Sequence, residues 1–273
     1  MHRYTWKIGV LQVVMLGVAA IFLFPIYILV NTALKPEGDR SSPLLPPASP
    51  AWGNFPTAWA EANLGPALLS SAFVTVTTIA LLVAIGSLAA YPLARITARW
   101  SPFVYYGFML GLLVPSLLAL IPLYSTFRDL GLLANPLALV ILYAGGQASF
   151  TIFLYTEFLR AVPRDYDEAA SIDGAGRWKT YFHVVLPLLR PITGTVIILN
   201  AVFIWNDFYA PLLYLSGSPA QTLPVAMYSF TGTYEVDWTL LFAALILGSL
   251  PMLAAFLIMQ KAVFRGYASG LKG

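Results

Sequence analysis

The stretch IGVLQVVMLGVAAIFLFPIYILVNTAL, residues 8–34, decides the fold of this chain, because it contains 27 consecutive residues without Asp, Glu, Lys or Arg. About 20 apolar residues cross the hydrocarbon core of a bilayer as a helix, and a charge near its centre costs about 2.5–3.5 kcal/mol. The stretch is too long for the apolar region of a signal peptide, which spans roughly 7–15 residues, and no small-residue cleavage site precedes the next segment. It therefore predicts a membrane-spanning helix that is retained in the protein.

Further apolar runs along the chain predict more membrane spans. Of the 273 residues, 59% are hydrophobic and 10% are charged, whereas roughly 25% of an ordinary soluble domain is charged. Charge-free runs lie at 62–94, 100–127, 130–156, 191–206, 208–234 and 238–260. The second half of 208–234 contains SGSPAQTLP, which is typical of a loop, so its first half is joined to 191–206 across Asp207. The sequence predicts an all-α, polytopic membrane protein with six transmembrane helices, near 10–32, 70–92, 103–124, 135–157, 189–213 and 239–261.

The basic residues are distributed unevenly between the predicted loops. With six spans both termini lie on one side, and that side holds 12 of the 15 Lys and Arg. Because cytoplasmic loops carry an excess of Lys and Arg, the termini are predicted to be cytoplasmic. The sequence pI of about 9.0 follows from this excess and does not indicate a nucleic-acid partner. The loop KPEGDRSSPLLPPASP, residues 35–50, is then an irregular extracytoplasmic connector.

Several kinds of chemistry are excluded by the residues that the chain lacks. It contains no cysteine, which excludes disulfides, thiol catalysis and cysteine metal sites. His2 and His183 are too far apart in sequence and topology to suggest a metal site, and no Ser/His/Asp set falls at membrane depth. The sequence therefore predicts neither an enzyme nor a metal protein.

The segment between the fourth and fifth spans is unusually polar, and it contains DEAASIDGAGRWKTYFHVVLPLLRP, residues 167–191. Acidic residues at its start suit the first turn of a helix, and Asp173-Gly174 is typical of a turn. After the turn, an apolar stripe with i, i+3, i+4, i+7 spacing predicts an amphipathic helix that ends at Leu186-Pro187; its members are Trp178, Tyr181, Phe182 and Val185. The alanine pair at 169–170 then offers a flat surface of small residues to another protein. The alternative is a solvated loop with an interfacial helix.

The spacing within this segment resembles the EAA motif of the permease subunits of bacterial ABC importers. Glu168-Ala169-Ala170 is followed after three residues by Gly174, and after nine more by Val184, one residue and Leu186-Pro187. Val184 stands where isoleucine is more usual. The flanking motifs look like the smaller permease subunit of the sugar-importing, maltose-type branch, over about residues 54–273: IPLYSTFRDLGLLAN (121–135), IDGAG (172–176), LPLLRP (186–191), WNDF (205–208), LPVAMYSF (223–230) and QKAVFRGYASGLKG (260–273). The residues SSAF (70–73) depart from the branch, which usually has Asn before Ser.

The resemblance implies the type I ABC importer permease fold and an arrangement of parts along the chain. Residues 1–69 are expected to form an N-terminal helix and a Pro-rich extracytoplasmic loop. Residues 70–261 are expected to form the transmembrane domain, with a cytoplasmic coupling segment at 163–187, and 262–273 a cytoplasmic tail. The expected location is the bacterial inner membrane. The expected partners are a second permease subunit, two ATPase subunits and an extracytoplasmic sugar-binding protein.

The function that the resemblance implies is ATP-driven import of a carbohydrate, with this chain forming half of the translocation pathway. The residues carried over as the ATPase-coupling site are Glu168, Ala169, Ala170 and Gly174. ATP and Mg²⁺ are expected in the partner ATPase and no cofactor in this chain, because GAGRWKT (174–180) has W-K-T where a P-loop requires G-K-[ST].

Two further sites have open alternatives. Gly270, Lys272 and Gly273 match a family tail that reaches between the ATPase subunits, but the same residues suit an ordinary disordered terminus. Asn206 and Asp207 lie at membrane depth, where Asp207 is a candidate for substrate binding or gating. The alternative for Asp207 is a hydrogen bond between helices or a position at headgroup level.

Two rival functions remain for a protein of this composition. A secondary transporter or channel would act without ATPase partners, but usually carries midplane ionisable residues or internal repeats, and this sequence offers one candidate acid and no visible repeat. An intramembrane enzyme would need a catalytic set within the spans.

Overall fold

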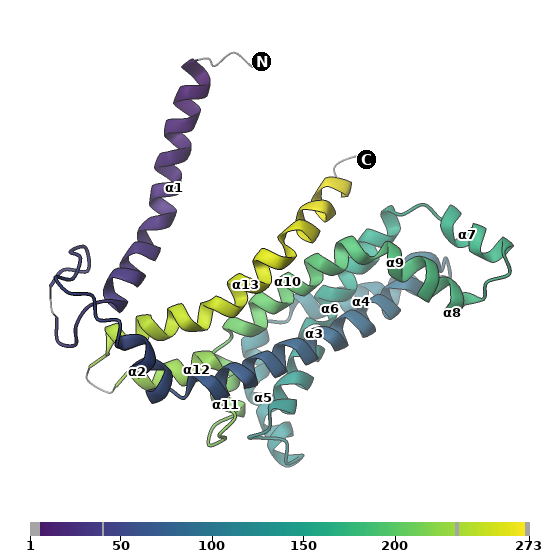
Figure 1. The fold of residues 1–273 in the computed structure, drawn as a ribbon. Coiled ribbons are helices and arrows are strands. Elements are labelled where there is room, and N and C mark those ends of the chain that lie inside the picture. Colours follow the sequence, from purple (N-terminus) through teal and green to yellow (C-terminus); the bar gives the residue numbers. More distant parts are fainter. Residues whose placement is uncertain (1–5, 40, 233–234, 271–273) are drawn as a thin grey trace. The chain divides into compact units, whose positions relative to one another are not determined.

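The computed structural model describes residues 6–39, 41–232 and 235–270, and these are almost entirely helical (Figure 1). The single β-bridge among them joins Thr231 to Val236. The chain divides into two compact units. The first comprises Met1–Gly65 and Ala226–Leu250, and the second comprises Pro66–Val225 and Pro251–Gly273.

Most helices of the described residues follow one another with short connections, whereas residues 34–53 form a long loop between the first two helices. Their bounds are α1 Trp6–Ala33, α2 Asn54–Glu61, α3 Leu64–Arg95, α4 Ser101–Leu113, α5 Ser116–Asp129, α6 Pro136–Ala161, α7 Asp165–Ile172, α8 Arg177–Thr180, the π-helical turn η1 Tyr181–Val185, α9 Leu186–Leu188, α10 Arg190–Asn206, α11 Tyr209–Tyr214, α12 Leu223–Met227, the 3₁₀ turn η2 Tyr228–Phe230 and α13 Trp238–Gly270.

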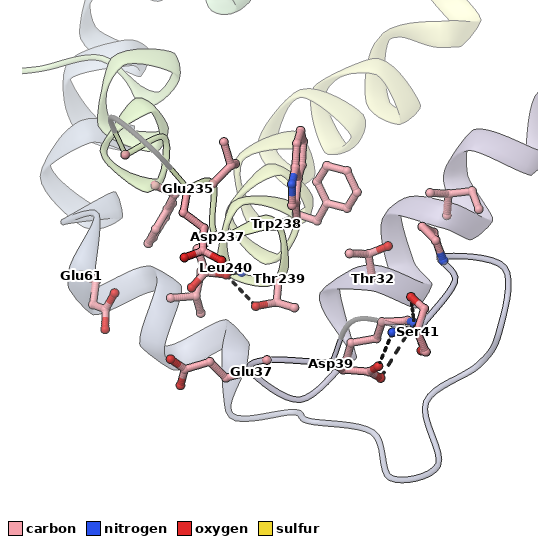
Figure 2. A pocket seen from close by; sticks show the side chains of 18 of the residues that line it. Thr32, Glu37, Asp39, Ser41, Glu61, Glu235, Asp237, Trp238, Thr239 and Leu240 are labelled. Atoms are coloured by element: carbon pink, nitrogen blue, oxygen red, sulfur yellow. Dashed lines mark hydrogen bonds and ion pairs between the residues drawn. The ribbon is translucent and has the colours of Figure 1, made fainter.

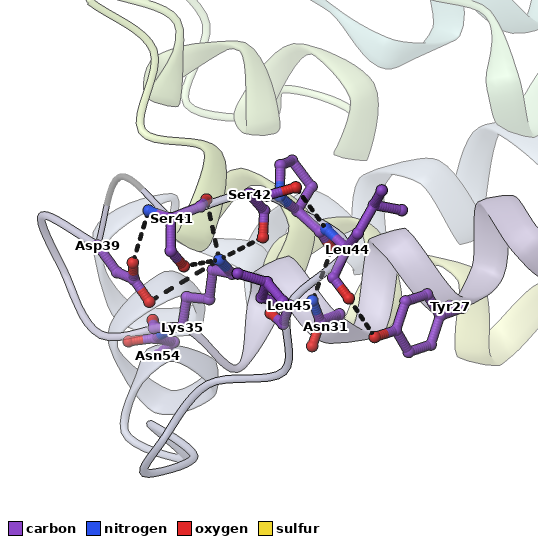
Figure 3. Close-up of polar contacts among 10 residues, drawn as sticks. Tyr27, Asn31, Lys35, Asp39, Ser41, Ser42, Leu44, Leu45 and Asn54 are labelled. Carbon is purple, nitrogen blue, oxygen red and sulfur yellow. Dashed lines mark hydrogen bonds and ion pairs between the residues drawn. The ribbon is translucent and has the colours of Figure 1, made fainter.

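In the first unit, the loop after α1 is held by side-chain hydrogen bonds to backbone carbonyls (Figure 3). The Lys35 ammonium group donates to the carbonyls of Ser41 and Ser42 at 3.0 and 2.9 Å, and its side chain is only 3% exposed. Asn31 Nδ2 donates to the carbonyls of Pro43 and Leu45 at 2.6 and 2.9 Å. The predicted irregular connector is therefore irregular in backbone but fixed to the end of α1, because buried donors require partners.

In the second unit, α6 is the central helix and packs against α4, α10 and α11 (Figure 1). Four of its large apolar side chains are almost fully enclosed: Leu139, Ile152, Tyr155 and Leu159. Apolar groups on several faces suit a helix that packs against several neighbours at once, as α6 does.

Four helices are long and apolar enough to cross a membrane without a break: Ile8–Ala33, Leu64–Arg95, Pro136–Ala161 and Trp238–Ile258. Two further candidates are bent pairs, α4 with α5 at 95° and Arg177–Leu188 with α10 at 70°. The described residues thus contain four to six spans, and the predicted six are reached if each bent pair crosses once.

The predicted continuous helix at 103–124 is wrong. The structure has α4 and α5 in its place, separated at Val114 and Pro115, where both residues have extended backbone with ψ of 115° and 117°. The residue before a proline is pushed out of the α region by the proline ring, and Val114 precedes Pro115. The third predicted span is consequently a bent pair.

The predicted helix at 189–213 is also interrupted. Helix α10 ends at Asn206, and Asp207 is extended with ψ of 131° before α11 begins at Tyr209. The Asp207 carboxylate accepts a hydrogen bond from the Tyr209 amide at 3.2 Å. The side chain thus provides a partner for an amide that a continuous helix would have bonded to a backbone carbonyl.

The expected helix end at Leu186-Pro187 is confirmed to within one residue, since the helical path from Arg177 ends at Leu188. The helical path continues through η1 and α9, and it bends only around Leu189. Pro187 has no amide proton to donate within this path, and the π-helical turn η1 directly precedes α9. At the far end of the chain, α13 continues as backbone helix beyond the predicted end at 261 to Gly270.

Candidate functional site

The predicted coupling segment consists of two helical arms joined by a glycine turn, and it projects at one end of the second unit (Figure 1). The first arm is α7, with three acidic residues in its first turn: Asp165, Asp167 and Glu168. Negative charge there interacts favourably with the amide end of the helix. The second arm runs from α8 through η1 to α9.

The turn between the arms requires glycine. Gly174 has φ of +73°, in the left-handed region. The Ala175 amide donates to the Ala170 carbonyl at 2.9 Å, and the Gly174 amide donates to the Ser171 carbonyl at 3.0 Å. This 6→1 and 5→2 pair of bonds is a Schellman motif, in which the left-handed position is usually glycine. The prediction of two short helices around a glycine turn is therefore confirmed in geometry.

The surface of α7 differs from the predicted flat alanine pair. Glu168 and Ala169 are exposed, whereas Ala170 is only 8% exposed. Among the described residues Glu168 forms no ion pair, so its carboxylate is available to another chain. Both alanines line a hollow of about 610 Å³ between the two arms, together with Asp165, Tyr166, Asp173, Ala175, Lys179, His183 and Val184. The segment thus offers a concave recess instead of a plane.

The predicted amphipathic stripe in the second arm is split between two faces. Tyr181 and Val185 are buried, while Trp178 and Phe182 are 69% and 53% exposed. Trp178 and Phe182 stack on each other with ring centroids 6.2 Å apart. The π-helical turn at Tyr181–Val185 has more residues per turn than an α-helix, and it shifts the register on which the stripe was predicted.

The residues on α3 that hold this segment were not predicted from the sequence. Arg95 Nε lies 2.9 Å from the Asp167 carboxylate, and the Tyr91 hydroxyl donates to the same carboxylate at 2.9 Å. The Ser87 and Tyr181 hydroxyl oxygens are 2.7 Å apart in a buried contact. The sequence contains one signal for them, a four-residue spacing of polar side chains at the end of the apolar run 62–94. This spacing does not identify the partners of those side chains.

Within the part of the chain that the structure describes, Asn206 and Asp207 form local and interhelical hydrogen bonds. The Tyr143 hydroxyl on α6 donates to Asp207 at 2.7 Å. Asn206 Nδ2 donates to the Val202 carbonyl at 2.8 Å, one turn back along its own helix. The Asp207 contact is a hydrogen bond between helices, which is the alternative that the sequence left open.

The predicted tail residues are only partly within the structure. Gly270 is the last described residue and ends α13, while Lys272 and Gly273 lie outside the described residues.

The first unit contains a larger recess of about 810 Å³, shown in Figure 2. Its lining includes five carboxylates: Glu37, Asp39, Glu61, Glu235 and Asp237. The hydrogen bond from the Ser41 amide lowers the pKa of the Asp39 carboxyl and thus favours its ionised form. Lys35 also lines the recess, but its ammonium group is already bonded to the loop. The recess therefore has an acidic lining.

Known proteins resemble the chain over most of its length. Residues 82–269 match the family model described as "Binding-protein-dependent transport system inner membrane component". The chain is 38% identical over 254 residues to the melibiose/raffinose/stachyose import permease protein MelC of Bacillus subtilis, covering 93% of this chain and 92% of that protein. It is 32% identical to the diacetylchitobiose uptake system permease protein NgcG of Streptomyces coelicolor, covering 92% of this chain and 84% of that protein.

A solved structure shares the fold. A chain from a bacterial ABC transporter involved in the import of the acidic polysaccharide alginate superimposes with a TM-score of 0.80 at 19% sequence identity, covering 96% of this chain and 99% of the other. The predicted ABC importer permease fold is confirmed by this match.

Proposed function

The chain belongs to the family of binding-protein-dependent transport system inner-membrane components, and from this premise we propose that it is a permease subunit of an ATP-driven carbohydrate importer. It would form half of the translocation pathway and transmit ATPase closure through the segment α7–α9. The observation that carries the proposal is the glycine turn between two helical arms, with exposed Glu168 and Ala169 beside a recess.

The coupling site is suited to docking a second protein. The small side chains of Ala169 and Ala170 leave room for close approach, and the recess of about 610 Å³ provides space for a projecting side chain. Glu168 supplies an exposed anion for a basic partner residue, which favours correct docking more than it adds affinity. Gly174 fixes the angle between the arms, because other L-residues resist its left-handed conformation.

The energy that must pass through this site can be bounded. Shifting a two-state equilibrium from 1:99 to 99:1 takes about 5.5 kcal/mol of differential binding. ATP binding would close the ATPase pair, draw together the docked segments of two permeases and change the side to which the pathway opens. Such a contact has to be stiff, which the Schellman turn and the buried attachments of the segment support.

The proposed substrate is a sugar, an oligosaccharide or a glycoside. The support comes from the relatives, MelC and NgcG, which are named for the uptake of carbohydrates. The proposed partners are a second permease, two ATPase subunits that bind ATP and Mg²⁺, and an extracytoplasmic sugar-binding protein. Asn206 and Asp207 remain proposed pathway residues, and Gly270, Lys272 and Gly273 remain proposed contacts of the tail with the ATPase.

The test is recovery of partners from detergent-solubilised native membranes with the wild-type chain and a Glu168→Lys variant, identified by mass spectrometry. We expect wild type to retain an ATPase, a second permease and a sugar-binding protein. The lysine in the variant would face the proposed basic residue of the ATPase, and like charges brought together cost several kcal/mol. The amount of ATPase recovered with the variant should therefore fall by a factor of about ten or more. Uptake of radiolabelled oligosaccharides into cells then tests the substrate class.

The matched control is Asp129→Lys at the end of α5, which reverses a carboxylate that is 69% exposed and lies far from the segment in sequence. This variant should retain the ATPase. Recovery of the wild-type chain without any ATPase would instead favour a secondary transporter or channel.

A further inference from the structure

Three polar side chains on one face of α3 attach the coupling segment to a membrane span. Ser87, Tyr91 and Arg95 are spaced at i, i+4 and i+8, so they form one stripe along the helix. We call these three residues the α3 stripe. Each of them contacts the segment α7–α9 or the end of α6 that precedes it.

Arg95 joins three helices through a single guanidinium group. Its Nη1 donates to the carbonyls of Leu159 and Val162 at 3.0 Å, at the end of α6. Its Nε forms the 2.9 Å ion pair with Asp167 in the first turn of α7. The two side chains are only 11% and 19% exposed, so solvent screens this pair less than a surface pair. The guanidinium therefore directs two hydrogen bonds at the end of α6, while its Nε attracts the Asp167 carboxylate by charge, because that pair lacks hydrogen-bond geometry.

Tyr91 and Ser87 extend the attachment to the second arm. The Tyr91 hydroxyl bonds to Asp167, while its ring lies 5.9 Å from the ring of Tyr181 in η1. The Tyr181 hydroxyl in turn bonds to Ser87. Both arms of the coupling segment are consequently attached to the same stripe.

The covalent connections of the segment to its neighbouring spans are both bent. Between α6 and α7 the backbone turns through Val162, which is extended with ψ of 128°, and Pro163. Between α9 and α10 the helix bends by 70° around Leu189. Hinge motions in proteins are absorbed by a few loop or element-terminal residues, and both bends lie at such positions. A displacement of α7 would therefore be dissipated at these bends unless a packed contact bypassed them.

We propose that the α3 stripe provides this packed contact: its three residues position the coupling segment so that the segment and α3 move as one body. Helix α3 is then the span that receives the displacement. This inference rests on the proposed ATPase docking. Ser87, Tyr91 and Arg95 are positioning residues, because they act through Asp167 and Tyr181 and touch neither substrate nor nucleotide.

The functional test uses the complex purified from membranes with Asp167→Asn, Arg95→Gln or Tyr91→Phe. We expect each variant to retain the ATPase, while carbohydrate transported per ATP hydrolysed falls about tenfold, within the range of measured allosteric coupling. A merely structural role would lower the amount of complex and leave this ratio unchanged. The matched control is Arg160→Gln, whose ion pair with Glu157 at 2.7 Å is formed by half-exposed side chains, and its ratio should equal that of wild type.

Two outcomes of that test overturn the proposal. One is an unchanged transport-to-ATP ratio in Asp167→Asn and Tyr91→Phe. The other is loss of the ATPase from these variants, which would make the stripe part of docking. If Arg95→Gln fails to accumulate, the two milder variants decide, since Tyr91→Phe removes one hydroxyl only.

A distance measurement separates this inference from the proposed function. The chain contains no cysteine, so spin labels can be placed at Ile172→Cys on α7 and Ile85→Cys on α3, which are 87% and 52% exposed. We expect one narrow distance distribution, unchanged by ATP, and a broad one when Asp167→Asn is added. A distance that changes with ATP in the parent chain overturns the one-body inference. A narrow distance in a chain that captures no ATPase would leave the attachment standing while the proposed function failed.

Discussion

At the residue scale, a substitution at Gly174 tests the effect of backbone strain without a change in side-chain packing. A β-carbon at Gly174 would meet no atom within 4 Å, so the cost of a larger residue comes from its φ of +73° alone. For Gly174→Val we expect roughly 1–2 kcal/mol of strain at this turn. The angle between the arms should change, oligosaccharide uptake should fall at least about tenfold, and the amount of chain in the membrane should stay near wild type. Uptake assays measure the transport, and quantified membrane extracts measure the amount of chain in the membrane.

Two substitutions provide controls for this residue. Gly176→Val adds the same side chain two positions later, where φ is −70° and no atom lies within 4 Å, so uptake should be retained. Gly174→Asn should retain more uptake than Gly174→Val, because Asn visits the left-handed region more readily. Normal uptake by Gly174→Val would contradict the need for a fixed turn.

At the element scale, the sequence predicted where apolar helices lie but not where they break. Prolines within the charge-free runs do not distinguish the two cases, since α1, α3, α5 and α13 continue through Pro25, Pro92, Pro122 and Pro251. The chain breaks at Pro115, and at Asp207 where the carboxylate bonds to Tyr143 on another helix. The break at Pro115 follows from the local effect of the proline ring on the residue before it, whereas the bond from Tyr143 to Asp207 is a tertiary contact that local preferences do not contain.

The candidate site divides in the same way. The turn at Gly174 was predictable because its signal lies within about ten consecutive residues. The α3 stripe was not, because the bonds Tyr91–Asp167 and Ser87–Tyr181 join residues 76 and 94 positions apart.

The contact between α3 and α6 leads to a prediction at the same scale. A β-carbon at Gly86 would lie 2.5 Å from Thr151 Cγ2 and 3.4 Å from Tyr155 Cδ2, and both neighbours are fully buried. Because a packed neighbour has to move, Gly86→Ala should destabilise the chain by about 1–3 kcal/mol. The measurement is the midpoint of thermal unfolding in detergent, followed by tryptophan fluorescence.

Its control is Gly107→Ala in α4, where a β-carbon would meet nothing within 4 Å. That variant should be neutral or more stable by about 0.4–1 kcal/mol, since alanine restricts the unfolded chain. Equal midpoints for the two variants would show that α3 and α6 do not approach closely at Gly86.

At the scale of the whole molecule, the bent pair α4–α5 determines the side of the membrane on which the coupling segment lies. If the pair crosses the bilayer, the segment lies opposite the loop 35–50. If the pair turns back, the segment and that loop lie on the same side. With six spans, 12 of the 15 Lys and Arg share the side of the termini, whereas eight would do so if both bent pairs turned back. The bias of basic residues toward the cytoplasm therefore favours crossing.

Single cysteines in the otherwise cysteine-free chain test this topology. Ile172→Cys on α7 and Leu44→Cys in the loop are 87% and 54% exposed, so both are accessible to a membrane-impermeant maleimide on their own side. In intact cells we expect label on Leu44→Cys only, and on Ile172→Cys only after permeabilisation, with no label on the parent chain. Label on both Leu44→Cys and Ile172→Cys in intact cells would show that α4–α5 turns back. Such a result would also separate the segment from cytoplasmic ATP, because an ATPase could not reach α7 from the cytoplasm.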